Sequence, residues 1–300
     1  MNILSKKVTL RWIVTVLAIL MVGLGWAKFT SQNRKSQTTL ELTERLKISI
    51  PEPIQELRIW MPIPKEDPYQ QVKIVTVKSP VHYLKTEEEE FGNRFLYFEP
   101  NSEKRKNFEI LVQYKILRFE QKGLEEKEPK KDRGNFSISR YLEPRGLEVI
   151  NEEIRKISKE VTKGIQDPLE KARALYDYVF KNMRYDKSGS GWGRGDVVYA
   201  CEIGKGNCTD FHSLFISLAR ASRIPARFQM GYPYPIPSDS QGTLPHSYHC
   251  WAEFYVEGKG WIPVDISEAW KDPKRVNYSL LPASSLIVKT PPVFILSAER

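Results

Sequence analysis

The chain of 300 residues contains few cysteine and histidine side chains, which are the usual ligands of structural zinc. It has three cysteines and four histidines, and no C-x-x-C or H-x₃-H pair. Structural zinc sites normally draw on such close pairs, so the sequence argues against a zinc centre. A D-x-[DN]-x-[DN]-G calcium loop is also missing. We therefore expect no metal and no other cofactor.

A nucleic-acid-binding module is missing as well, although the chain is basic. The formal net charge is +9 at pH 7, but acidic residues are interspersed with the basic ones, as in 102–106 and 122–133. No stretch combines basic and aromatic residues in the manner of a nucleic-acid module. We expect no nucleic-acid partner. A solvated surface accounts for the mixed charge, and anionic cell-envelope polymers or lipid head groups are alternative neighbours.

The one long apolar run, 12–27, lies near the amino terminus. Lys6, Lys7 and Arg11 precede it, and a basic polar stretch follows. This order predicts an export signal or a single membrane anchor, although the run is shorter than the roughly 20 residues that span a bilayer. The positive-inside rule places the rest of the chain outside the cytoplasm. We expect an anchored protein with an extracytoplasmic catalytic part. Cleavage near Ala27, giving a secreted form, is the alternative.

The remainder divides into a β-rich region and a mixed region. Short runs of β character, punctuated by prolines, predict a small β-sandwich over 38–121. The expected strands are 42–50, 56–61, 72–77, 94–98 and 108–119. The charged stretch 122–135 is interpreted as a linker, and 1–37 as the signal or anchor with its flank. The region 136–300 is expected to carry the chemistry.

Two helices are predicted early in this last region, over 146–163 and 167–183. Asp167 followed by Pro168 is typical of an N-cap with proline at the first helical position. The glycine-rich stretch 188–195 follows the second helix. It borders the substrate cleft or is a disordered connector.

Cys208 is the strongest candidate for chemistry. It follows the glycine-containing turn 204–206 and precedes apolar residues spaced three and four apart, which predicts the core face of a helix. These residues are Phe211, Leu214, Phe215, Leu218 and Ala219. In the first helical turn, unpaired N–H groups and the positive end of the helix dipole favour thiolate over thiol. Cys201 and Cys250 are interpreted as buried hydrophobic residues or as disulfide partners.

A base and a carboxylate that orients it follow in the sequence. The segments 249–256 and 261–265 are predicted as strands of a hairpin around the turn 258–260. Such a hairpin pairs the start of the first strand with the end of the second, which brings His249 close to Asp265. If the helix that carries the cysteine packs on the hairpin, the three residue types form a nucleophile, base and orienter.

Other interpretations of these residues stay open. His249 alone is also typical of a histidine on a half-buried strand, and Asp265 of a turn or cap residue. His212, one helical turn after Cys208, is a competing base, but its place on the same helix leaves little room for a substrate carbonyl. His246 is expected in a loop, at the surface or in contact with substrate.

Four separated blocks of sequence resemble the core of the transglutaminase-like superfamily. The blocks are 206–211, 223–227, 249–253 and 261–265. The resemblance covers about 169–267 and implies an α+β, papain-related fold in which a cysteine-bearing helix packs on an antiparallel sheet. It also implies Cys208 as nucleophile, His249 as base and Asp265 as orienting carboxylate, and it is compatible with a β domain ahead of the core.

The resemblance implies thiol-dependent acyl transfer or amide hydrolysis on proteins or peptides through a thioester. The superfamily includes crosslinkers, peptidases, amidases and inactive members, so transferase and hydrolase stay open, as do substrate and oligomeric state. The backbone N–H of Cys208 is one candidate oxyanion donor, and Tyr185 or Trp192 a second. The alternatives are an inactive cell-envelope binding or scaffold protein, and a redox or metal-binding protein that uses Cys201, Cys208 and Cys250.

Overall fold

The structure is a computed structural model that describes residues 37–50, 56–67, 69–100, 107–119, 138–232, 249–271 and 288–290. The predicted amino-terminal apolar run, the 122–135 linker and His246 lie outside these residues. Within the described parts of the chain, no helix combines the length and the apolar character needed to cross a membrane.

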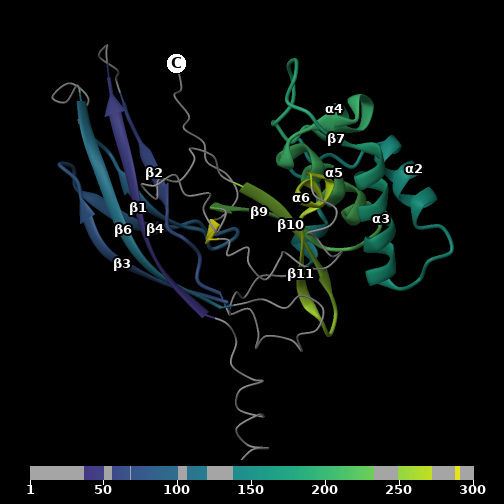
Figure 1. The fold of residues 1–300 in the computed structure, drawn as a ribbon, viewed down its shortest axis with the longest axis horizontal. Coiled ribbons are helices and arrows are strands. Elements are labelled where there is room, and N and C mark those ends of the chain that lie inside the picture. The colour runs from purple at the N-terminus through teal and green to yellow at the C-terminus, as the bar shows by residue number, and fades with distance from the viewer. Residues whose placement is uncertain are drawn as a thin grey trace, which may run out of the picture. The chain divides into compact units, whose positions relative to one another are not determined.

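The first six strands form two three-stranded sheets (Figure 1). The strands are β1 (Gln37–Ser49), β2 (Ile59–Pro62), β3 (Gln70–Lys78), β4 (Tyr83–Glu87), β5 (Arg94–Phe98) and β6 (Asn107–Phe119). One sheet has the order β1-β6-β3, and β3 pairs antiparallel with β6; the other has the order β2-β5-β4, and both its pairs are antiparallel. The five predicted strands are confirmed. β4 was not predicted because three of its five side chains are exposed, so it lacks an apolar alternation.

Both sheets contribute to one hydrophobic cluster. Leu96 and Phe98 of β5 are fully buried in it, together with Ile110 and Val112 of β6. Burying side chains of this size stabilises the fold by about 1.5–3 kcal/mol each. The alternating apolar residues of the sequence therefore supply a shared core, and the β-sandwich arrangement itself stays a prediction.

The second region contains the helices. They are η2 (Ile138–Leu142), α2 (Glu152–Val161), α3 (Pro168–Asn182), α4 (Val197–Ile203), α5 (Cys208–Ala221) and α6 (Ile266–Lys271). The Asp167 side chain accepts a hydrogen bond from the backbone N–H of Glu170, and Pro168 begins α3, so the predicted N-cap is confirmed. The short helices η2, α4 and α6 were not predicted because each spans too few residues to show a helical period.

A four-stranded antiparallel sheet accompanies these helices. Its strands β9 (Ala226–Tyr232), β10 (His249–Val256), β11 (Gly260–Val264) and β12 (Val288–Thr290) lie in the order β11-β10-β9-β12. In the β10–β11 hairpin, Ala252 lies opposite Val264 and Val256 opposite Gly260, which confirms the predicted pairing. A short parallel pair joins β7 (Arg184–Tyr185) to β8 (Lys205–Gly206), just before α5.

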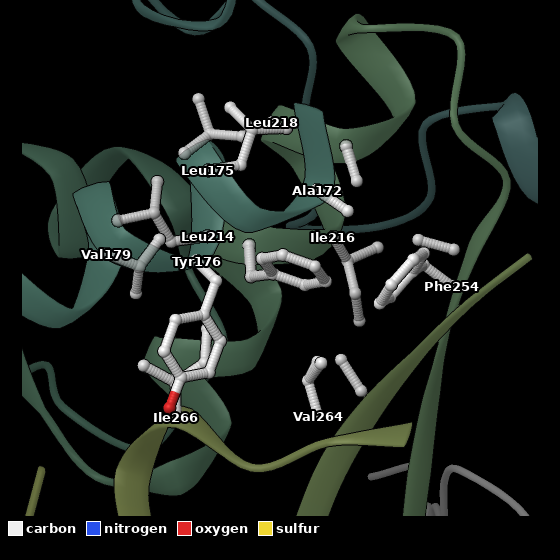
Figure 2. Close-up of a cluster of buried hydrophobic side chains, with 14 of the residues drawn as sticks. Ala172, Leu175, Tyr176, Val179, Leu214, Ile216, Leu218, Phe254, Val264 and Ile266 are labelled. Atoms are coloured by element: carbon white, nitrogen blue, oxygen red, sulfur yellow. The ribbon is translucent and has the colours of Figure 1, made fainter. Parts of the chain in front are cut away.

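α5 is the central helix of this region. It packs against β9 and β10 and against α2, α3, α4 and α6, and its residues from 210 to 220 are all buried. Figure 2 shows the surrounding side chains of α3, α5, β10 and β11, with Ile266 at the start of α6. The labelled residues are Ala172, Leu175, Tyr176, Val179, Leu214, Ile216, Leu218, Phe254, Val264 and Ile266. Because the helix is enclosed, its first residue has a fixed position.

Candidate active site

Cys208 is the first residue of α5, as predicted. The Asn207 side chain accepts a hydrogen bond from the N–H of Thr209 at 2.8 Å, and the Asp210 carboxylate accepts one from the N–H of Asn207 at 2.9 Å. This reciprocal pattern is a capping box. The capping bonds use the N–H groups of Asn207 and Thr209. Within the described residues, no acceptor is found for the N–H of Cys208.

The structure brings His249 and Asp265 together. The Nε2 atom of His249 is hydrogen-bonded to Oδ2 of Asp265. The other carboxylate oxygen accepts bonds from Oγ of Ser267 and from the N–H of Glu268, each at 3.0 Å, so Asp265 also caps α6. The two roles considered for Asp265, orienter and cap, are compatible: the cap fixes the carboxylate that holds the imidazole. His249 is also hydrogen-bonded to the side chain of Cys208, and Nδ1 is the ring nitrogen that is not bonded to Asp265.

Electrostatics favour charge separation between the cysteine and the histidine. Hydrogen bonding to Cys250 and His249, with the positive charge of His249, outweighs burial and lowers the pKa of Cys208 to about 4. Burial disfavours the imidazolium, but the adjacent Asp265 carboxylate raises the pKa of His249 to about 10. Burial opposes ionisation of Asp265 too, yet its attraction to His249 holds its pKa below the usual range. Both shifts favour the thiolate form of Cys208 and the imidazolium form of His249.

His212, the competing candidate for the base, bonds to the backbone at the start of α6. It is fully buried, and its Nε2 accepts a hydrogen bond from the N–H of Ile266 at 3.0 Å. The same atom lies 3.6 Å from Oδ1 of Asp265. Burial lowers the pKa of His212, so the ring stays neutral. His212 thus holds the start of α6, and His249 is the imidazole bonded to the carboxylate.

The remaining cysteines differ from Cys208 in their electrostatics. All three cysteines are free, so the disulfide considered for Cys201 and Cys250 is not formed. Burial raises the pKa of Cys201 to about 11 and also raises that of Cys250, so both stay protonated. The Sγ atom of Cys250 lies 3.7 Å from Oγ1 of Thr209, beside the nucleophile candidate. In the described ranges, no group of three or more His, Cys, Asp or Glu could hold a metal ion.

The two candidate side chains for an oxyanion site lie in different environments. Tyr185 packs against Phe211, with ring centroids 6.2 Å apart, and Nζ of Lys271 lies 4.1 Å from the Tyr185 centroid. Burial raises the pKa of Tyr185, and the negative charge of Cys208 contributes in the same direction. The indole N–H of Trp192 donates instead to the carbonyl of Gly189 at 3.2 Å. Of the two, Tyr185 has the electrostatic coupling to Cys208.

Asp210 and Cys250 are site residues that the sequence interpretation missed. The spacing of Asn207 and Asp210 is that of a capping pair, and this signal was available in the sequence. Nothing local indicated Cys250, because its contact with Cys208 depends on how β10 packs against α5.

Comparisons with known proteins concern the family and the fold of the chain. The family model described as the transglutaminase-like superfamily matches residues 155–266. An uncharacterized protein of Haemophilus influenzae is 29% identical over 257 residues, which is 77% of this chain and 69% of that protein. The uncharacterized protein YebA of Bacillus subtilis is 24% identical over 140 residues, 43% of this chain and 19% of its own length.

One solved structure shows the same fold. The crystal structure of a candidate cysteine protease from Cytophaga hutchinsonii gives a TM-score of 0.57 at 18% identity, covering 86% of this chain and 83% of that one. At this identity the likeness concerns the fold alone. The predicted resemblance to the superfamily is confirmed.

Proposed function

Because residues 155–266 match the model of the transglutaminase-like superfamily, we propose that the chain catalyses thiol-dependent acyl transfer or amide hydrolysis on protein or peptide substrates. One observation carries the proposal: Cys208, at the start of a buried helix, lies beside a histidine whose far nitrogen is bonded to a buried carboxylate. Cys208 is the nucleophile, His249 the acid and base, and Asp265 the group that orients the imidazole.

The first half-reaction forms a thioester. The Cys208 thiolate attacks the carbonyl carbon of an amide, and the carbonyl oxygen becomes an oxyanion. When the tetrahedral intermediate collapses, the C–N bond breaks and the leaving amine takes a proton from the His249 imidazolium. The oxyanion accepts a hydrogen bond from the N–H of Cys208, and Tyr185 is the second donor. Each donor of this kind contributes about 3–4 kcal/mol to the transition state.

The second half-reaction releases the acyl group. Water or a primary amine attacks the thioester carbon while His249 accepts the proton of the attacking group, and the thiolate leaves. Water makes the enzyme a hydrolase, and a lysine-type amine makes it a crosslinking transferase. Asp265 stabilises the imidazolium in both halves of the cycle.

The location of the protein is a second part of the proposal. The apolar run 12–27 after three basic residues favours a single anchor with the catalytic domain outside the cytoplasm, or secretion after cleavage near Ala27. Cell-envelope polymers or lipid head groups would then be its neighbours. Alkaline phosphatase fused to the carboxyl end should be active in this orientation. If a β-galactosidase fusion, which reports a cytoplasmic location, were the active one instead, the orientation would be contradicted.

Product analysis tests the proposed chemistry. The purified chain is incubated with glutamine-containing and other peptides, with and without a primary amine, and ammonia release and amine incorporation are followed. Activity above a Cys208→Ala control is the expected result. Wild-type protein that matches this control on every peptide would instead favour the alternative, an inactive envelope scaffold with the same fold.

A further inference from the structure

The glycine-rich loop between β7 and α4 has a defined path. Gly189, Gly191, Gly193 and Gly195 have φ values of 79°, 93°, 81° and 68°, a backbone region that favours glycine. A Cβ on Gly195 would lie 2.7 Å from Oγ of Ser213, in the second turn of α5. The loop backbone therefore packs directly on the helix that begins with the proposed nucleophile. This contact argues against the disordered connector that the sequence left open.

Asp210 holds the loop in this position. Its carboxylate accepts hydrogen bonds from the N–H of Gly193 at 2.6 Å and from the N–H of Gly195 at 3.2 Å, in addition to the capping bond from Asn207 at 2.9 Å. The side chain is fully buried. A Cβ on Gly206 would lie 2.2 Å from Oδ2, so backbone encloses the carboxylate closely. One buried charge thus joins the loop, the helix cap and the residue before Cys208.

The loop carries the aromatic side chain of Trp192, which shares a neighbouring ammonium group with Tyr185. Nζ of Lys187 lies 5.8 Å from the ring centroid of Trp192 and 5.7 Å from that of Tyr185, the residue coupled to Cys208. The ammonium group of Lys187 therefore lies within 6 Å of both ring centroids. Their relative positions depend on the loop path that Asp210 fixes.

We propose that Asp210 is a positioning residue that holds the loop 189–195 as one wall of the acyl-substrate site beside Cys208. The inference rests on the proposed function, because the wall matters only if Cys208 receives an acyl group. A carboxylate two residues after the nucleophile does not help thiolate formation, since like charges raise a thiol pKa. Its bonds to the loop explain why a buried negative charge is nevertheless present.

The test variant is Asp210→Asn in the full chain, because an amide group cannot accept all three N–H bonds in the same way. Hydrogen exchange at Gly193 and Gly195, followed by mass spectrometry of loop peptides, should become at least about tenfold faster. With a peptide substrate, kcat/KM should fall on the order of ten- to a hundredfold, mainly through KM. The pH midpoint of Cys208 alkylation by iodoacetamide should stay the same or fall.

Asp196→Asn is the matched control. Asp196 caps α4 by accepting bonds from the N–H groups of Val198 and Tyr199 at 3.1 and 3.3 Å, at the end of the same loop. Asparagine caps a helix about as well as aspartate, so this variant makes the same change of carboxylate to amide without loss of the cap, and it should leave KM and the exchange of the glycine amides close to wild type. If Asp210→Asn fails to fold, Gly193→Ala serves instead. At φ 81° an alanine is strained, and its Cβ would lie 3.1 Å from Nδ2 of Asn207, so it displaces the loop while Asp210 stays in place.

The outcomes separate the two proposals. Unchanged loop exchange and unchanged KM in Asp210→Asn would overturn the positioning role, and so would an equal loss of alkylation and turnover, which indicates general damage to α5. Failure of the proposed function would look different. In that case wild-type Cys208 would show no selective alkylation at pH 6 and no turnover, whatever the state of the loop.

Discussion

Replacing His249 with alanine should change how Cys208 reactivity depends on pH. In the wild-type protein the contacts of Cys208 with Cys250 and His249 lower its pKa to about 4, so about 99% of it is thiolate at pH 6. Without the imidazolium the pKa rises, at most to the ordinary thiol value of about 8.5 because the Cys250 contact remains. At that limit about 0.3% is thiolate at pH 6, roughly 300-fold less.

The alkylation rate should change much less than the thiolate fraction. Thiolate nucleophilicity increases with pKa with a Brønsted coefficient of about 0.45, so a rise of about 4.5 units makes each thiolate roughly 100-fold more reactive. At pH 6 the variant should therefore react about threefold more slowly than wild type. At pH 10, where both are fully ionised, it should react up to about 100-fold faster. The two pH–rate profiles should cross.

The assay is the second-order rate of iodoacetamide addition to Cys208 between pH 3.5 and 10.5, measured by peptide mass spectrometry. His82→Ala is the control, because His82 is an exposed histidine on the β-rich region and its loss should leave the profile unchanged. Superimposable profiles for wild type and His249→Ala would refute the ion pair. A midpoint near pH 8.5 in the profiles of both proteins would also refute the ion pair.

Three further substitutions test the groups around the pair. Asp265→Asn removes the charge that keeps the imidazole protonated, so kcat should fall on the order of 10³–10⁴-fold. The upper limb of the pH–kcat profile, near pH 10 in wild type, should also move to lower pH. An unmoved limb would contradict the assignment of Asp265. His212→Phe leaves the buried N–H of Ile266 unpaired and should lower the free energy of unfolding by about 1–3 kcal/mol in urea titrations, whereas unchanged stability would show that the bond is dispensable. Gly206→Ala places a Cβ 2.2 Å from the Asp210 carboxylate and should lower stability by about 1–3 kcal/mol in the same titrations; a neutral result would mean that the turn relaxes freely.

Local patterns predicted the elements that carry the site. The spacing of apolar residues after Cys208 gave α5, because a buried helix repeats its contacts every three to four residues. The turn at 258–260 predicted the pairing of the two hairpin strands, and this pairing predicted that His249 lies close to Asp265. Both results depend on residues close together in sequence.

Long-range contacts were beyond such patterns. The carboxylate of Asp210 bonds to N–H groups 15 and 17 residues earlier, and no periodicity links an aspartate to glycine amides. The sequence favoured His249 over His212 as base because a base on the same helix leaves little room for a substrate carbonyl. It could not show that His212 accepts the N–H of Ile266, because this bond depends on α6 docking against α5.

The most direct test of the account is the detection of an acyl group on Cys208. The full chain is mixed with p-nitrophenyl acetate, quenched in acid after milliseconds to seconds, and examined by intact mass and peptide mapping. We expect a burst of about one nitrophenol per chain and one acetyl group on Cys208, with neither in Cys208→Ala. An acetyl group on other residues only, or an equal burst in Cys208→Ala, would contradict the claim that Cys208 is an activated nucleophile.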